Sequence, residues 1–322
     1  MNDHLNASHL PATALDGVAH LTHLGVIQVE GEDAAKFLHG QLTQDFSLLG
    51  LNQARLAAFC SAKGRMQASF IGFKRPDGKV VLVCHRDILA PTLKRLSMFV
   101  LRAKALLSDA TEVFSLYGLA GSATKNIAAD AGLMWTKGDF DDQSVVTLYP
   151  ADGINRQLVL QSAGSPLPSG QAMTLDDWLW SEVRSGVATL SASVVEAFVP
   201  QMLNYESVGG VNFKKGCYPG QEVVARSQFR GTLKRRSFLF HSPSLLAAGD
   251  EVFSKADRSQ PAGTVVQVAA VPVVAQEPQY SRGFDALISV QLSALELGPL
   301  FSPGSTQELV QLPLPYPLLE DV

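Results

Sequence analysis

This 322-residue sequence contains one stretch in which glycines, a proline, a cysteine and charged residues occur close together. It is Lys215-Gly216-Cys217-Tyr218-Pro219-Gly220-Gln221-Glu222. Gly216 and Gly220 allow backbone conformations with positive φ, and Pro219 stiffens the turn between them. A loop of this kind can bring backbone N–H groups close to a ligand. The sequence therefore predicts a glycine-rich loop over residues 215–226 that is suited to binding.

Positive charge is concentrated around this stretch, although the whole chain has a net charge of −4. The basic residues are Lys214, Lys215, Arg226, Arg230, Lys234, Arg235 and Arg236, and Glu222 is the carboxylate among them. Cationic neighbours favour the thiolate form of a cysteine, so an exposed Cys217 would be a strong nucleophile. The alternative is that Cys217 is a small residue packed beneath a turn, as free cysteines often are.

The sequence before this stretch alternates between strand and helix patterns. Period-two or continuous apolar runs predict strands over residues 24–29, 54–60, 66–73, 80–84 and 113–119. Apolar residues at helical spacing predict helices over residues 34–42, 124–131 and 175–187, and a further helix that begins at Pro91. The irregular order, with hairpins among the strands, favours an α+β fold over a doubly wound parallel sheet.

The pattern changes near residue 237. Short apolar runs at residues 237–240, 251–254, 263–269 and 286–292 are separated by Gly, Pro and Asp. Several short strands at this spacing are typical of a small closed β domain, because closure removes exposed sheet edges. We therefore expect two regions, residues 1–236 and residues 237–322.

Composition and cysteine spacing exclude several classes of protein. The net charge argues against a protein that coats nucleic acid or anionic membrane with its whole surface. Cys60, Cys84 and Cys217 form no CxxC pair, and the histidines have no metal-ligand spacing, so no metal site is expected. Unclustered thiols and the lack of a recognisable signal peptide or membrane span favour a cytoplasmic protein, with a monomer as the default.

The stretch from Lys215 to Glu222 is long and specific, and it resembles the signature of the YgfZ family. The resemblance extends over nearly the whole chain, through Ala225-Arg226, Arg230-Gly231, residues 31–45, Lys63-Gly64-Arg65, Phe198-Val199-Pro200-Gln201, Gly209-Gly210, Ala262-Gly263-Thr264-Val265 and Leu314-Pro315-Tyr316. This family is related in fold to the T-protein of the glycine cleavage system, an aminomethyltransferase. The resemblance implies two interleaved α+β subdomains that bind folate, followed by a small C-terminal β-barrel.

The resemblance also implies a function and the residues that perform it. It implies tetrahydrofolate binding and support for iron–sulfur enzymes, including one that modifies tRNA. Cys217 would be the reactive thiol, with Lys215 and Arg226 as anion-binding or orienting groups. The folate-binding residues would be Trp178, Leu24, Tyr218, Gln221 and Glu222, with Leu24 at the place of a family tryptophan. A polyglutamylated folate would suit the basic patch, because its tail is polyanionic.

Two alternatives remain open, and the sequence does not decide whether the protein is an enzyme. The first is a folate-dependent aminomethyl transferase. Ala68 and Ser69 stand where aminomethyltransferases carry an acidic pair, and general acid–base chemistry needs a carboxylate within reach. The second is an RNA-binding module that uses the basic patch at residues 214–236, although few aromatic residues accompany it.

Overall fold

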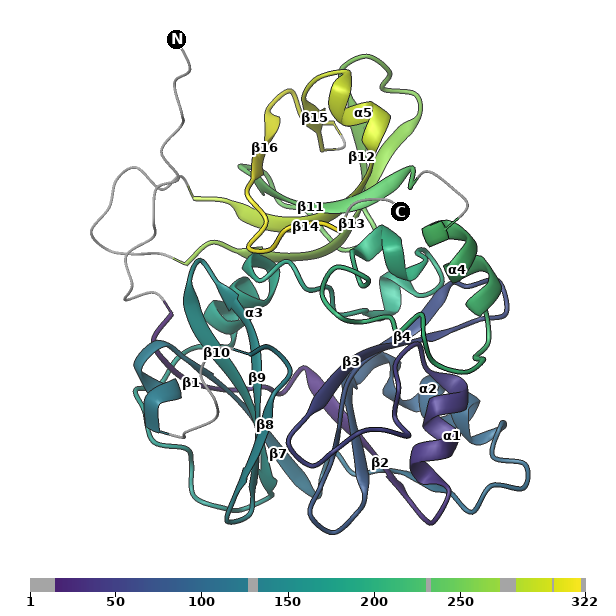
Figure 1. The fold of residues 1–322 in the computed structure, drawn as a ribbon. Coiled ribbons are helices and arrows are strands. Elements are labelled where there is room, and N and C mark those ends of the chain that lie inside the picture. The colour runs from purple at the N-terminus through teal and green to yellow at the C-terminus, as the bar shows by residue number, and fades with distance from the viewer. Residues whose placement is uncertain (1–14, 127–132, 230–232, 273–281, 303, 320–322) are drawn as a thin grey trace.

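Three β-sheets form the framework of the protein, and each lies in its own part of the molecule (Figure 1). The computed structural model describes residues 15–126, 133–229, 233–272, 282–302 and 304–319, and every structural statement below concerns these residues. Two of the sheets are open and five-stranded, and the third is a closed barrel. Within the described parts of the chain, every helix is too short or too polar to cross a bilayer.

The first open sheet has the strand order β3-β4-β5-β2-β6, and all of its pairs are antiparallel. Its elements are β2 (Leu24–Glu30), α1 (Ala34–Gln41), β3 (Ala54–Cys60), β4 (Met66–Lys74), β5 (Val80–His85), α2 (Arg86–Ser97) and β6 (Leu106–Asp109). The prediction that a helix begins at Pro91 was wrong. Helix α2 begins at Arg86, directly after β5, so Pro91 lies inside it and removes one helical N–H.

The second open sheet has the order β1-β7-β10-β9-β8. Its strands are β1 (Gly17–His20), β7 (Phe114–Ala120), β8 (Lys137–Phe140), β9 (Gln143–Ala151) and β10 (Ile154–Ser162). Strand β1 precedes the whole first sheet in the chain but pairs with β7, so the two subdomains interleave, as predicted. The helix predicted over residues 124–131 is instead the 3₁₀ helix η1 (Gly121–Asn126), and residues 127–131 lie outside the described chain.

The C-terminal sheet closes on itself in the order β11-β14-β13-β12-β15-β16, which confirms the predicted barrel. Its strands are β11 (Arg235–Ser242), β12 (Glu251–Ser254), β13 (Pro261–Ala270), β14 (Phe284–Gln291), β15 (Leu300–Phe301) and β16 (Glu308–Leu312), and α5 (Leu292–Glu296) follows β14. Pairing of β16 with β11 closes the ring. Closure leaves the backbone groups of the barrel no open edge.

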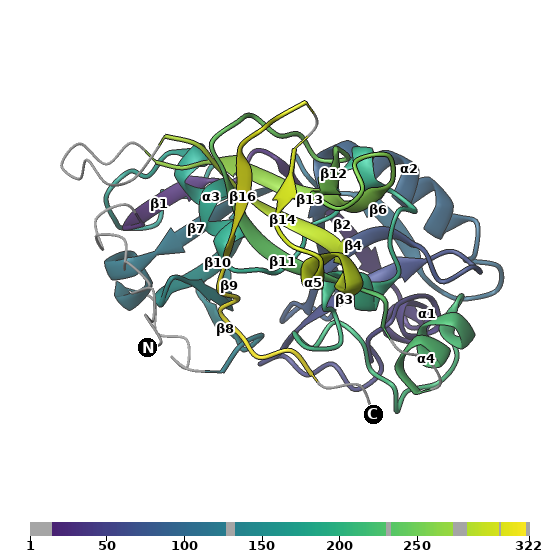
Figure 2. The ribbon, with the colours of Figure 1, turned by 90° about the horizontal axis from the view of Figure 1, so that it is seen from above.

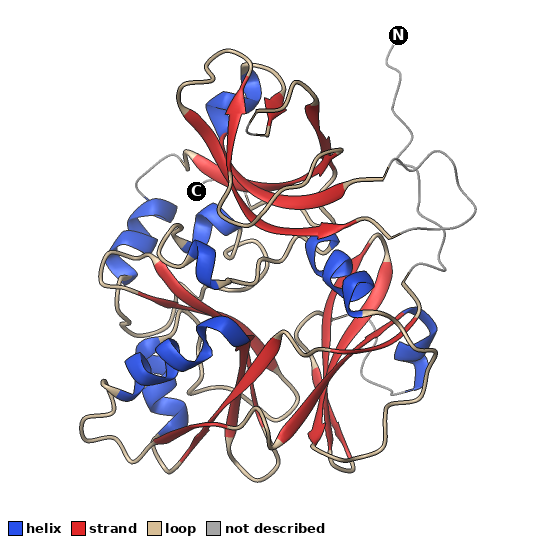
Figure 3. Ribbon diagram, turned by 180° about the vertical axis from the view of Figure 1, so that it is seen from behind, coloured by secondary structure: helices blue, strands red, loops and turns tan. Residues whose placement is uncertain are grey.

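Helix α3 (Leu175–Arg184) lies between the second sheet and the barrel (Figures 1 and 3). The Thr174 hydroxyl accepts a hydrogen bond from Asp177 N at 3.1 Å and caps the helix. The Trp180 indole donates to Asp285 Oδ2 on β14 at 2.8 Å, which joins the helix to the barrel. Beyond α3, the short helices η2 (Ala192–Val194) and η3 (Pro200–Leu203) lead to α4 (Gln221–Phe229). Helix α4 lies nearer to the barrel than α1 does (Figure 1), and the two helices lie close together only in the view from above (Figure 2).

Candidate functional site

Cys217 is exposed on the segment that precedes α4, whereas the other two cysteines are buried. Cys60 and Cys84 are each about 1% exposed, and burial raises the pKa of each thiol to about 12. All three cysteines belong to the described chain, so Cys217 is the one thiol that a reagent in solution can reach directly.

The segment around Cys217 is shorter than the predicted loop over residues 215–226. Helix α4 begins at Gln221, and the Gly220 carbonyl accepts the backbone N–H groups of Val223 and Val224 at 3.1 and 3.2 Å. The sequence did not predict this helix start, because Pro219 and Gly220 directly before it are residue types typical of turns. We call residues 214–220 the cysteine loop.

Gly220 joins the cysteine loop to the turn between β3 and β4. Its φ of +80° is in the left-handed region, and a Cβ at this position would overlap the Ser61 carbonyl oxygen and lie 2.7 Å from Gly64 Cα. Gly64 has a φ of +72°, and a Cβ there would lie 2.9 Å from the Val223 Cβ. The stretch Lys63-Gly64-Arg65 is therefore packed against the start of α4.

Lys215 fixes the other end of the loop to α1. Its buried ammonium donates to the carbonyl oxygens of His39 and, at 2.8 Å, Leu42, and lies 4.6 Å from the centre of the Tyr218 ring. A cation at the C-terminus of a helix is stabilised by the carbonyl dipoles there. Burial lowers the Lys215 pKa to about 8, although the negative charges of Asp45 and a Cys217 thiolate oppose this shift.

His39, at the end of α1, lies against the backbone of the cysteine loop. Its Nε2 is 3.4 Å from the position that a Cβ on Gly216 would occupy, and Gly216 itself is not in the left-handed region. Its Nδ1 is 3.0 Å from Asp45 Oδ1. Burial raises the Asp45 pKa, but the Leu48 N–H and His39 outweigh it and hold the pKa below its usual value. Neither His39 nor Asp45 was predicted from the sequence to belong to the site.

The other residues of the predicted site have different roles here. Gln221 and Glu222 lie in the first turn of α4, and Arg226 pairs with Glu222 one turn later on the exposed face of the helix. The Tyr218 ring is buried beneath the Lys215 ammonium, and burial raises its pKa. The structure therefore brings Lys215, Cys217, Tyr218, Gln221, Glu222 and Arg226 together.

Trp178 and Leu24 lie in a different place, in the core beside β7 and β10. The Trp178 indole is fully buried, with the Arg156 guanidinium 4.4 Å from the ring centre, and a Cβ on Gly118 would overlap the ring. Its Nε1 donates to Glu182 Oε1 at 2.9 Å. In this arrangement the indole packs entirely against protein atoms.

Glu182 is the centre of a buried polar cluster that was not predicted from the sequence. Its Oε1 lies 3.2 Å from His23 Nε2, and its Oε2 accepts from Gln267 Nε2 of the barrel at 3.2 Å. Burial raises the Glu182 pKa, but His23, Arg156 and Trp178 together hold it below its usual value. The cluster thus joins the β1–β2 connection, β10, α3 and the barrel around one carboxylate.

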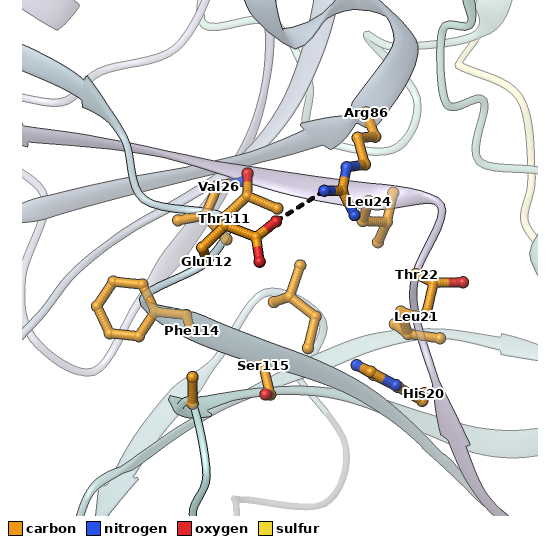
Figure 4. A pocket seen from close by; sticks show the side chains of 12 residues that line it. His20, Leu21, Thr22, Leu24, Val26, Arg86, Thr111, Glu112, Phe114 and Ser115 are labelled. Atoms are coloured by element: carbon orange, nitrogen blue, oxygen red, sulfur yellow. Dashed lines mark hydrogen bonds and ion pairs between the residues drawn. The ribbon is translucent and has the colours of Figure 1, made fainter.

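Leu24 lines two cavities. The larger has a volume of about 170 Å³ and is lined by residues that include His20, Thr22, Arg86 and Glu112, with the Arg86–Glu112 ion pair along one side (Figure 4). The smaller, about 40 Å³, is lined by residues that include Glu182, Ser69 and Cys84. Typical ligand pockets are roughly 300–1,000 Å³. The larger cavity could therefore hold a single ring system, but not a whole folate in the present side-chain arrangement.

The basic residues of the predicted patch do not form one continuous surface. Lys215 is buried, and Arg236 is buried with its guanidinium 2.7 Å from Glu206 Oε1. Lys214 and Lys234 are exposed, and Arg230 lies outside the described residues. Among the described residues, two of the seven basic side chains are thus buried within the fold.

The sequence motifs that lie far apart in the chain converge beneath the cysteine loop. The Thr43 hydroxyl donates to the Gly210 carbonyl at 2.6 Å and accepts from the Ala58 N–H at 2.8 Å. The buried Gln201 amide donates to the Val224 carbonyl of α4 at 2.6 Å. These contacts give the loop a rigid base built from β3, α1 and η3.

Comparison with solved structures gives the fold class. The glycine cleavage system aminomethyltransferase T from Bartonella henselae superimposes with a TM-score of 0.67, covering 96% of this chain and 88% of that protein, at 14% sequence identity. The protein therefore has the aminomethyltransferase T fold, and on it carries an exposed cysteine loop. No family model matches the sequence.

Comparison with curated proteins gives the family. The tRNA-modifying protein YgfZ of Photorhabdus laumondii is 30% identical over 81% of this chain and 82% of its own length. The tRNA-modifying protein YgfZ of Cronobacter sakazakii is 29% identical over 98% of this chain and 96% of its own length. This chain belongs to the YgfZ family.

Proposed function

We propose that this protein binds tetrahydrofolate and supports iron–sulfur enzymes, including a tRNA-modifying one, through the exposed thiol of Cys217. The observation that carries the proposal is the contrast among the cysteines: Cys217 is exposed on a loop held by buried contacts, and Cys60 and Cys84 are inert in the core. A rigid loop that presents one thiol is the arrangement expected of a site that reacts with a partner molecule. The relatives' role in tRNA modification is consistent with it.

Folate binding is supported by the fold and by the chemistry around Leu24. The cavity beside Leu24 has apolar walls and hydroxyl, imidazole and carboxylate groups, which suit a flat polar ring such as a pterin. Leu24 and His20 would contact that ring, and Trp178 would act indirectly by fixing Glu182. Tetrahydrofolate would supply a carrier for one-carbon units.

The geometry favours this role over aminomethyl transfer. Ala68 and Ser69 lie within β4 and are buried, and the Ser69 hydroxyl accepts the Leu190 N–H at 2.8 Å. Strand β4 therefore supplies an apolar side chain and an occupied hydroxyl where the transfer chemistry needs a carboxylate.

The proposal is tested in a strain that lacks the protein. Cys217→Ser should fail to restore the activity of an iron–sulfur tRNA-modifying enzyme, whereas Cys84→Ser, at a buried thiol, should restore it. Both variants should bind tetrahydrofolate in calorimetric titrations as the unmodified protein does. Full restoration by Cys217→Ser would contradict a role for the thiol, and absence of heat with the unmodified protein would contradict folate binding.

A further inference from the structure

The end of α1 brings an imidazole that is paired with a carboxylate against the cysteine loop, at the residue before Cys217. His39 Nδ1 faces Asp45 Oδ1 at 3.0 Å, and Nε2, on the far side of the ring, faces the loop at the residue before Cys217. Lys215, two positions before Cys217, donates a hydrogen bond from its ammonium to the His39 carbonyl oxygen. This contact fixes the cysteine loop to the end of α1. The imidazole therefore lies against the loop at Gly216, the residue before Cys217, and its opposite nitrogen is occupied by Asp45.

The Asp45 carboxylate determines which nitrogen of His39 carries the proton. An ionised carboxylate only accepts hydrogen bonds, so Nδ1 must be the donor in the pair. The neutral ring then has its lone pair on Nε2, on the side of the cysteine loop. A nucleophile, a base and a third group that orients the base are the parts of a thiol site activated for attack.

We propose that His39 is the base that accepts the proton of Cys217, and that Asp45 is a positioning residue that orients and stabilises the charged imidazole. The inference rests on the proposed function, because it takes Cys217 as the reacting group. The substrate class is an electrophilic carbon with a leaving group, which a soft thiolate attacks readily.

The reaction step balances without an oxidant or a reductant. The S–H bond of Cys217 breaks, and its proton passes to His39 Nε2. The sulfur electron pair forms a bond to the electrophilic carbon, and the leaving group departs with the electron pair of its bond to that carbon. The imidazolium then returns its proton to the leaving group or to water.

Other charges near the site act in a known direction. The Lys215 ammonium lies on the loop side, and a negative charge on Cys217 would raise the Lys215 pKa. Asp45 pairs with His39, and the exposed Glu222–Arg226 pair on α4 has both signs of charge. At a pH below the ordinary pKa of a cysteine, about 8.5, a thiol is protonated and needs a base to react.

Alkylation by iodoacetamide tests the proposal without folate or a client enzyme. The rate of carbamidomethylation at Cys217, followed by mass spectrometry, is compared at about pH 6.5 and at about pH 9.5. His39→Gln, which keeps a donor for Asp45 but is not a base, should react ~10-fold more slowly at the lower pH and within about twofold of the unmodified protein at the higher pH. Asp45→Asn should fall between the two proteins at the lower pH.

The matched control is His85→Gln. His85 also pairs with an aspartate, Asp87 at 2.6 Å, but at the start of α2, and this variant should keep the unmodified rate at both pH values. Cys60 and Cys84 are internal controls, because their alkylation reports unfolding of any variant.

Two outcomes would overturn the proposal. One is an equal rate at the lower pH for folded His39→Gln and the unmodified protein, and the other is an equal loss in His85→Gln. If His39→Gln exposes Cys60, Asp45→Asn alone decides, and an unmodified rate in that variant counts against the proposal. A Cys217→Ser protein that restores the tRNA-modifying enzyme would refute the proposed function while leaving the alkylation result intact.

Discussion

At the scale of single residues, Gly220 shows how one missing Cβ shapes the site. Gly220 and Gly78 have nearly the same φ, +80° and +86°, but a Cβ on Gly78 would meet nothing within 4 Å, whereas one on Gly220 would overlap Ser61. Alanine at either position must therefore adopt the left-handed conformation, which costs about 1 kcal/mol. Only Gly220→Ala also introduces a steric clash, with the Ser61 carbonyl oxygen.

We expect Gly220→Ala to lower the free energy of unfolding by roughly 1–3 kcal/mol more than Gly78→Ala. Urea unfolding of both variants, followed by tryptophan fluorescence, measures this difference. The alkylation rate of Cys217 should change in Gly220→Ala as well, because the cysteine loop must shift. Equal losses of stability in Gly220→Ala and Gly78→Ala would show that the β3–β4 turn can move enough to accommodate the added Cβ.

The lowered pKa of Lys215 should make the stability of the protein depend on pH. Its pKa is about 8 in the folded protein, against an ordinary value of 10.5, so between these values the unfolded chain holds a proton that the folded protein has released. Stability therefore rises with pH in this window, and the cost of burying the ammonium is fully present below it.

The corresponding measurement compares the protein with Lys215→Met, which has no charge to bury. The free energy of unfolding of the unmodified protein, minus that of Lys215→Met, should increase by about 1–3 kcal/mol between about pH 7.5 and about pH 10. Titration of groups far from Lys215 is common to both proteins and cancels in the difference. Lys214→Met, at an exposed neighbour, should show no such change; a constant gap for Lys215→Met would contradict the assignment.

At the scale of elements, strands with a clear apolar pattern were predicted well, and elements defined by their surroundings were not. Strand β3 has the predicted ends, and β4 and β5 each extend one residue further, because their buried side chains form continuous apolar runs. Strands β9 and β10 were missed, although Asp152-Gly153 between them is a strong hairpin signal. Helix α4 was missed because its first turn depends on Gly220 and on the Gln201 contact from another segment.

Helix α3 carries the charge that holds the polar cluster together. Glu182→Gln keeps the shape of the side chain but leaves Arg156 and His23 without a buried counter-charge. We expect a loss of about 2–4 kcal/mol of unfolding free energy at neutral pH, because removing one partner of a buried pair leaves the other unpaired. Glu112→Gln, at an exposed ion pair with Arg86, should change stability by less than about 1 kcal/mol.

The effect of Glu182→Gln should also depend on pH. The folded-state pKa of Glu182 is held below the ordinary value of 4.5, so its stabilising contribution is present above that value and is lost as the pH falls through the folded-state pKa. The gap between the two proteins in denaturant unfolding should therefore narrow below about pH 4. A gap that widens on acidification would mean that the carboxylate is destabilised where it lies.

At the scale of the whole molecule, the candidate site is assembled from segments that the sequence separates widely. Lys215 bonds the end of α1, and Thr43 bonds Gly210, across more than 160 positions in each case. The sequence predicted the cysteine, the cations and the glycines, because these residue types have a local meaning. It could not predict that His39 faces the cysteine loop, since that proximity follows from the packing of α1 against it.

The barrel and the body of the protein are joined by a buried carboxylate, Asp285 on β14. It accepts the Trp180 indole N–H at 2.8 Å, lies 3.5 Å from the Arg184 guanidinium of α3, and pairs with His241 of the barrel at 2.9 Å. Because one side chain serves both parts, it should make them unfold together.

We expect Asp285→Ala to lower the free energy of unfolding by about 2–4 kcal/mol and to separate the melting of the barrel from that of the body. Calorimetry should then show two transitions where the unmodified protein shows one, while Glu251→Gln, at an exposed carboxylate on β12, should keep a single transition. Glu182 should then lose its hydrogen bond from Gln267 when the barrel melts, because Gln267 lies on the barrel. A single, merely lowered transition in Asp285→Ala would mean that apolar packing alone couples the two parts.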